Sequence, residues 1–180
     1  MLRITVPATE LWDEENERFI RTKEQTLSLK HSLVSISKWE SKWHKAFLSK
    51  KDKTQEEVLD YIRCMTITQN VDPAVYLCLT PENIAEINAY IENPMTATVF
   101  SEDRAGRANN EIVTSELIYY WMIALQIPQE YEKWHLNRLL TLIRVCNIKN
   151  SPPKKRSKND IMRRNAELNA ARRKQFNSKG

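Results

Sequence analysis

Apolar residues recur at helical spacing over much of the chain, beginning just after Ser32. In the segment LVSISKWESKWHKAFL, residues 33–48, one apolar stripe follows a period of three to four residues. The stripe contains Leu33, Ile36, Trp43 and Phe47, with Trp39 beside it. We therefore expect a first amphipathic helix over residues 33–48.

Two further helices are predicted from their capping residues. Thr54 and Glu57 match a capping box ahead of EEVLDYIRCM, in which each side chain binds the backbone amide of the other residue. Thr80 and Pro81 begin PENIAEINAYIEN, because proline is favoured in the first turn of a helix, and Pro94 ends it.

The two most apolar helices are predicted in the C-terminal half of residues 1–150. Thr114 or Ser115 caps ELIYYWMIALQI, which is apolar almost all round and is expected at the centre of the core. Pro128 is expected to begin a helix over QEYEKWHLNRLLTLIRVCN. Its buried side is predicted to contain Trp134, Leu136, Leu139, Leu140, Ile143 and Cys146.

Short strands complete the predicted elements. LRITVP alternates apolar and polar residues, EQTLSLKHS places Leu27 and Leu29 at period two, and MTATVF (95–100) is rich in β-branched residues. The acid-rich LWDEENERF is expected to be a solvated loop or a short helix. The predicted fold class is α-rich α+β: a helical domain with a few short N-terminal and central strands and a basic C-terminal helical extension.

Charge divides the chain at residue 150. Residues 151–180 hold ten Lys or Arg and two acidic residues, a net charge of +8 in a chain whose total is +5. Residues 1–150 are therefore a mildly acidic globular domain, and the prolines of NSPPKK separate it from a basic, partly helical or disordered tail. The basic residues proposed to act in the tail are Arg163, Arg164, Arg172, Arg173 and Lys174.

Composition excludes several classes of protein. The only glycines are Gly106 and Gly180, whereas phosphate-binding loops need several glycines close together. The three cysteines lie far apart, which predicts reduced, buried thiols of an intracellular protein rather than a disulfide framework. The longest apolar stretch, LIYYWMIALQI, is about half the length of a bilayer-spanning helix. We expect no cofactor, no bound metal and no membrane contact.

The segment SKWESKWHKAF raises the question of a functional site. Trp39 and Trp43 are four residues apart and so lie on one face of a helix, either in the core or on an aromatic contact surface. His44 has no second metal ligand three or four residues away. His135 with Arg138 as an anion clamp, and Cys64 as a nucleophile, likewise lack a locally fixed partner. We predict no catalytic residues.

Several aromatic-rich segments resemble the tail assembly chaperones of long-tailed, non-contractile (siphovirus-type) bacteriophages. The segments are HSLVSISKWESKWHKAFL, LDYIRCMT, INAYIENPMTATVFSE and EIVTSELIYYWMIALQIP followed by WHLNRLLTLIRVCNIKNSPPKK. The resemblance covers about residues 25–175 and rests on the order and intervals of these clusters.

The resemblance implies a non-enzymatic protein of the host bacterial cytoplasm that is absent from the mature virion. Such a chaperone binds the tape measure protein, shields its apolar helices and helps to recruit tail tube subunits. The residues expected to contact the partner are Trp39, Trp43, Phe47, Tyr119, Tyr120 and Trp134. Self-association is expected, since several copies are needed to cover a long helix. The alternative is a small basic nucleic-acid-binding phage protein, a packaging or regulatory factor that uses the tail.

Overall fold

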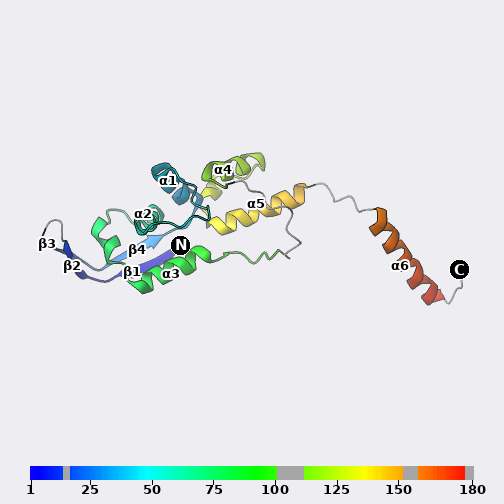
Figure 1. Cartoon of the computed structure of the whole chain (residues 1–180), viewed down its shortest axis with the longest axis horizontal. Coiled ribbons are helices and arrows are strands. Elements are labelled where there is room, and N and C mark those ends of the chain that lie inside the picture. Colours follow the sequence, from blue (N-terminus) through cyan, green and yellow to red (C-terminus); the bar gives the residue numbers. More distant parts are fainter. Residues whose placement is uncertain (14–16, 101–111, 152–157, 177–180) are drawn as a thin grey trace. The chain divides into compact units, whose positions relative to one another are not determined.

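The computed structural model describes residues 1–13, 17–100, 112–151 and 158–176 (Figure 1). These residues form two compact units, Met1–Asn147 and Ile148–Gly180. In chain order the elements are β1 (Leu2–Val6), β2 (Thr9–Asp13), β3 (Arg18–Thr22), β4 (Gln25–Leu29), α1 (Leu33–Trp43), α2 (Gln55–Met65), the 3-10 helix η1 (Pro73–Cys78), α3 (Pro81–Glu92), α4 (Ser115–Ala124), the 3-10 helix η2 (Gln129–Lys133), α5 (Leu136–Asn150) and α6 (Lys158–Phe176). The predicted helix-rich fold with a few short strands is confirmed, and the strands form two small sheets.

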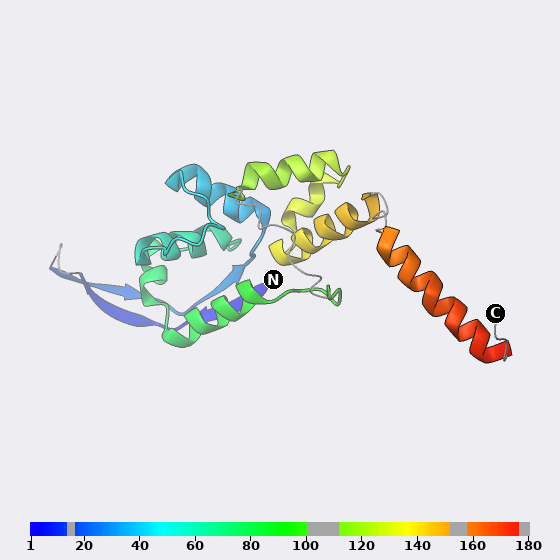
Figure 2. The same cartoon turned by 45° about the vertical axis from the view of Figure 1, so that its right-hand side comes forward.

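The strands form two antiparallel pairs that follow one another along the same two segments of chain. β1 pairs with β4 and β2 pairs with β3 in the same register, and Pro7, which lacks an amide donor, lies between the two pairs. The loop or helix predicted over LWDEENERF is therefore wrong for Leu11–Asp13 and Arg18–Phe19, which lie in β2 and β3, and residues 14–16 lie outside the described residues. Trp12 faces Phe19 across this ladder, with ring centroids 4.9 Å apart, and such cross-strand aromatic pairs stabilise strands. Both views show the β2–β3 end reaching beyond the helices (Figures 1 and 2).

The helices of the first unit pack around the β1–β4 pair. α3 lies along β1, and α1 packs against both α2 and α4. The predicted capping box of Thr54 and Glu57 is confirmed at the start of α2, and the predicted helix start at Thr80 and Pro81 is confirmed for α3, which Thr80 caps. The core gathers inward-facing residues of strands and helices, including Ile4, Leu27, Leu29, Leu33, Ile36, Trp39, Ile62, Met65, Ile87, Ile118, Leu136 and Leu139.

α1 is shorter than the sequence predicted. It ends at Trp43 because His44 adopts a left-handed conformation (φ 52°, ψ 35°) and its amide closes the last turn onto the carbonyl of Glu40. Phe47 therefore lies outside the helix, although its ring still packs against the core.

The expected strand over MTATVF is also wrong. Among the described residues of this segment none lies in a strand, and Met95 has a positive φ of 51°. Side chains bind the backbone locally instead: Asn93 Oδ1 accepts the amide of Met95 at 2.8 Å, and Thr96 Oγ1 accepts that of Thr98 at 3.1 Å. Such local bonds compete with strand pairing.

α4 differs from its prediction in length and burial. Thr114 caps it as expected, but the helix ends at Ala124, and Gln126 then turns the chain with a φ of 54°. The expectation that α4 is buried all round is wrong, since Tyr120 is 63% exposed and Ile123 is 77% exposed. Only one side of this apolar helix faces the core.

The long helix predicted from Pro128 is divided in two. Pro128 caps η2, and the chain is extended at Trp134 and His135 before α5 starts at Leu136. The break allows His135 to form a bridge with Ser32, the N-cap of α1. Leu136, Leu139 and Ile143 are buried as predicted, whereas Trp134, Leu140 and Cys146 are only half-buried.

The second unit contains α6. The described side chains of this helix, residues 162–176, are all exposed. The three cysteines are free thiols; Cys78 is buried, as predicted, while Cys64 and Cys146 are half-buried. None of the helices in the described part of the chain has the length and apolarity needed to cross a membrane.

Candidate functional site

The two tryptophans of SKWESKWHKAF join α1 to α2. The indole N–H of Trp39 donates to the carbonyl of Glu57 at 2.9 Å, and that of Trp43 donates to the carboxylate of Asp60 at the same distance. Trp39 is 1% exposed and stacks on the half-buried Trp43, with ring centroids 6.2 Å apart. Spacing by one helical turn thus serves the contact between two helices.

Two lysines strengthen this junction. Lys42 binds the carboxylate of Asp60, and Lys45 binds that of Glu57. Burial raises the pKa of Asp60, but hydrogen bonds from Lys42 and Trp43 outweigh it and leave the pKa below its ordinary value. The hydrogen bond from Lys45 lowers the pKa of Glu57. Both acids are therefore ionised partners of the α1–α2 junction at neutral pH.

Phe47 completes the aromatic core of this region. Its ring lies 5.2 Å from that of Trp39 and 4.0 Å from that of Tyr61, measured between centroids. Of the predicted contact residues, Trp39 lies wholly in the core, while Trp43 and Phe47 pack against it with part of their surface exposed. The three aromatic residues of SKWESKWHKAF thus contribute to the packing of α1 against α2 and the core.

Tyr119, Tyr120 and Trp134 lie elsewhere in the first unit. The hydroxyl of Tyr119 donates to the carboxylate of Glu132 in η2 at 2.9 Å, and burial together with this acid raises its pKa to about 12. Trp134 stacks on Tyr131 with centroids 4.0 Å apart and carries the guanidinium of Arg138 on its ring at 4.1 Å. Tyr119 and Trp134 therefore each bind a residue of η2 and stabilise its position.

Tyr120 and Ile123 form the exposed apolar face of α4. They are three residues apart and therefore neighbours on one side of the helix. The opposite side is anchored by Ile118, which is fully buried, and Met122, which is 2% exposed. The sequence indicated Tyr120 but not Ile123, because a helix that is apolar all round gives no periodicity from which to assign its outer side.

Glu40 positions the start of α4 from within α1. This side chain is 8% exposed, and its two oxygens accept the backbone amides of Phe47 and Ser115, each at 2.7 Å. A carboxylate at a helix N-terminus accepts a hydrogen bond from an amide that has no partner inside the helix. Its negative charge also interacts favourably with the positive end of the helix dipole. Nothing in the local sequence pattern identified this role, because Ser115 lies 75 residues away.

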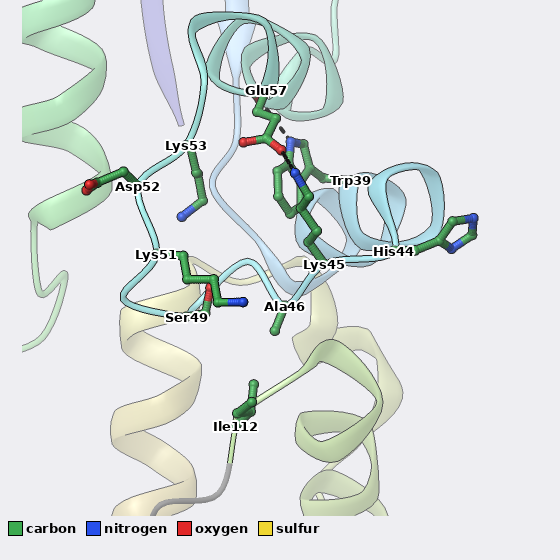
Figure 3. Close-up of a pocket in the computed structure, with 10 residues that line it drawn as sticks. All are labelled: Trp39, His44, Lys45, Ala46, Ser49, Lys51, Asp52, Lys53, Glu57 and Ile112. Atoms are coloured by element: carbon green, nitrogen blue, oxygen red, sulfur yellow. Dashed lines mark hydrogen bonds and ion pairs between the residues drawn. The ribbon is translucent and has the colours of Figure 1, made fainter.

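A pocket of about 290 Å³ lies next to this anchor. Figure 3 shows Ala46 and Ile112 pointing toward each other across it, with the side chains of Lys51 and Lys53 beside them. His44, at the end of α1, points away from the pocket and is exposed. The sequence did not identify this pocket, since Ile112 and the lysines come from distant segments.

The two other histidines meet in the core. The rings of His31 and His135 have centroids 5.0 Å apart; Nδ1 of His31 lies 2.5 Å from the hydroxyl of Tyr61, and Nε2 of His135 donates to the carbonyl of Tyr90 at 2.9 Å. Burial, and then the neighbouring His135, lower the pKa of His31 to about 4. Arg138 lies on Trp134 instead of joining His135, so the predicted alternative of an anion clamp is not formed.

Cys64 is not activated as a nucleophile, because burial and the charge of Asp60 raise its pKa. In the part of the chain that the structure describes, no three His, Cys, Asp or Glu side chains gather as metal ligands. Glu14 and Glu15, in the acid-rich run, lie outside that part.

In α6 the side chains of Arg163, Arg164, Arg172, Arg173 and Lys174 are exposed.

Comparison with known proteins gives no further assignment. No family model matches the chain, and searches of curated proteins and of solved structures found no match.

Proposed function

We propose that this chain is a non-enzymatic phage tail assembly chaperone that binds the tape measure protein, shields its apolar helices and helps to recruit tail tube subunits. The proposal combines the resemblance of the aromatic-rich segments with one structural observation. That observation is the exposed apolar face of α4, where Tyr120 and Ile123 are 63% and 77% exposed.

An apolar helix face open to solvent is suited to pack against another helix. Tape measure helices carry long apolar stripes, which cause aggregation when exposed and are covered by helix packing. Covering Tyr120 and Ile123 contributes about 2–4 kcal/mol. This corresponds to a change in affinity of about one to three orders of magnitude per site. Several copies would then bind along one tape measure helix, and self-association of the chaperone would increase their total affinity for it.

The basic tail has a supporting role in this proposal. Its exposed arginines attract acidic segments of a partner, which raises the association rate more than the affinity. The protein acts in the host bacterial cytoplasm and is left out of the mature virion.

The proposal is tested by co-expressing the chain with the tape measure protein of the same phage and measuring the soluble fraction of the latter. The native chain is expected to keep it soluble. Tyr120→Gln with Ile123→Gln is expected to lose most of this effect, because glutamine retains helix propensity but removes the apolar face. The matched control replaces Ile67 and Leu77, which are 50% and 57% exposed elsewhere in the first unit, with glutamine. A tape measure protein that is equally insoluble with and without the native chain contradicts the proposal.

The alternative of nucleic-acid binding rests on the exposed basic residues of α6. It predicts retention of DNA that falls steeply with salt and disappears when Arg163, Arg164, Arg172 and Arg173 are replaced by alanine. Absence of retention at about 50 mM salt excludes it.

A further inference from the structure

The pocket beside the start of α4 combines apolar side chains with the cations of Lys51 and Lys53. Ala46 and Ile112 contribute apolar surface, above the buried Trp39, and Ile112 is 65% exposed although it faces the pocket. The side chains of Lys51 and Lys53 lie beside Ala46 and Ile112 (Figure 3). An occupant with both an apolar group and negative charge would complement both kinds of surface.

The carboxylates that line this pocket do not neutralise these two lysines. Glu57 is bound by Lys45, and Asp52 points away from the cavity (Figure 3). The ammonium of Lys53 lies 4.6 Å from the centroid of the Phe47 ring and adds to the positive charge near Glu57. Within the described residues, no ion pair joins Lys51 or Lys53 to an acid.

The charge of the surrounding segment has the same sign. Residues 38–53 contain six lysines and two acids, whereas the rest of residues 1–147 contains eleven basic and nineteen acidic residues. Residues 38–53 are thus a basic segment within an otherwise acidic unit. Such local charge favours an acidic partner segment.

We propose that the pocket takes an acidic, amphipathic segment of the partner protein, with an apolar side chain between Ala46 and Ile112 and carboxylates on Lys51 and Lys53. This rests on the proposed function and specifies the chemistry of the partner segment. A nucleic-acid backbone also carries negative charge, but it has no apolar side chain to fill the space between Ala46 and Ile112. The apolar lining therefore favours a peptide.

The test measures fluorescence anisotropy of a labelled peptide with leucine on one helical face and glutamate on the other, added to the full chain. Lys51→Glu with Lys53→Glu is expected to raise its Kd about tenfold at about 50 mM salt, because two exposed attractions become repulsions. The matched control, Lys23→Glu with Lys133→Glu, makes the same change of net charge away from the pocket and is expected to leave Kd within about twofold. Replacing Ala46 with aspartate fills the pocket with charge and is expected to weaken binding as well.

Three outcomes overturn this inference. The first is equal loss of binding in the control variant, which means that only net charge matters. The second is equal or tighter binding of a peptide with lysine in place of every glutamate. The third is tighter binding of a single-stranded DNA than of the acidic peptide, where this DNA binding is lost in the Lys51→Glu, Lys53→Glu variant. If the native chain keeps the tape measure protein soluble and any of these results is found, the pocket assignment fails while the proposed function stands. If the acidic peptide binds as expected but the tape measure protein stays insoluble, the proposed function fails instead.

Discussion

Glu40 offers a sharp test of how the exposed face of α4 is held in place. Its carboxylate is buried and accepts two backbone amides, those of Phe47 and Ser115, each at 2.7 Å. Glu40→Ala removes both acceptors, and each buried amide left without a partner costs about 1–3 kcal/mol. The expected loss of unfolding free energy is therefore about 2–6 kcal/mol. Glu40→Gln keeps one carbonyl acceptor and should lose about half as much.

Urea unfolding followed by far-ultraviolet circular dichroism measures both losses, with Glu86→Gln on the exposed side of α3 as the matched control. Amide exchange gives a second measurement, since the amides of Phe47 and Ser115 should exchange faster in both Glu40 variants. If Glu40→Gln is as stable as the native chain, or if it loses as much as Glu40→Ala, the two-amide account of this carboxylate is wrong.

Three further predictions follow from burial and charge. Trp39→Ala should cost about 3–5 kcal/mol of unfolding free energy and Trp43→Ala clearly less, because only the first is fully buried; equal costs in urea would contradict this. On α4, Ile118→Ala should cost about 2–4 kcal/mol while Ile123→Ala changes stability by less than about 0.5 kcal/mol, again measured in urea. Burial holds the pKa of His31 at about 4 in the folded chain, against 6.5 when unfolded, so the unfolded chain binds the extra proton between these values. This group leaves stability unchanged above pH 6.5 and lowers it by about 3 kcal/mol as the pH falls to about 4; a flat stability profile over that window would refute the assignment.

The sequence was informative wherever a local pattern decides the structure. The capping residues Thr54, Thr80 and Thr114 each accept an amide at the start of the predicted helix, because capping depends on residues only three positions apart. The alternation at Leu27 and Leu29 likewise marked a real strand. These features need no knowledge of the rest of the fold.

Errors arose where distant residues decide. The acid-rich segment around Trp12 was predicted as loop or helix, yet it continues the register that β1 and β4 establish. The outer side of α4 followed from its packing on α1 and not from its own composition. The length of α1 was overestimated because the helix ends at His44 in a left-handed conformation, which is uncommon for residues other than glycine and is not expected from the sequence.

The candidate site was predicted only in part. Trp39 and Trp43 proved to be bound to α2 through their indole nitrogens, which spacing alone could not distinguish from an open aromatic surface. Tyr120 was among the predicted contact residues and is exposed. Ile123 and Ile112 were missed, because neither the outer side of an apolar helix nor a pocket between distant segments has a local sequence pattern.

The central claim is that this protein works by covering apolar surface of a partner with the exposed face of α4. Hydrogen–deuterium exchange of the chain, alone and in complex with a soluble fragment of the tape measure protein, tests it most directly. The account predicts slower exchange on binding over residues 112–127, with little change in η1 on the same unit. Unchanged exchange over residues 112–127 in a saturated complex would contradict it.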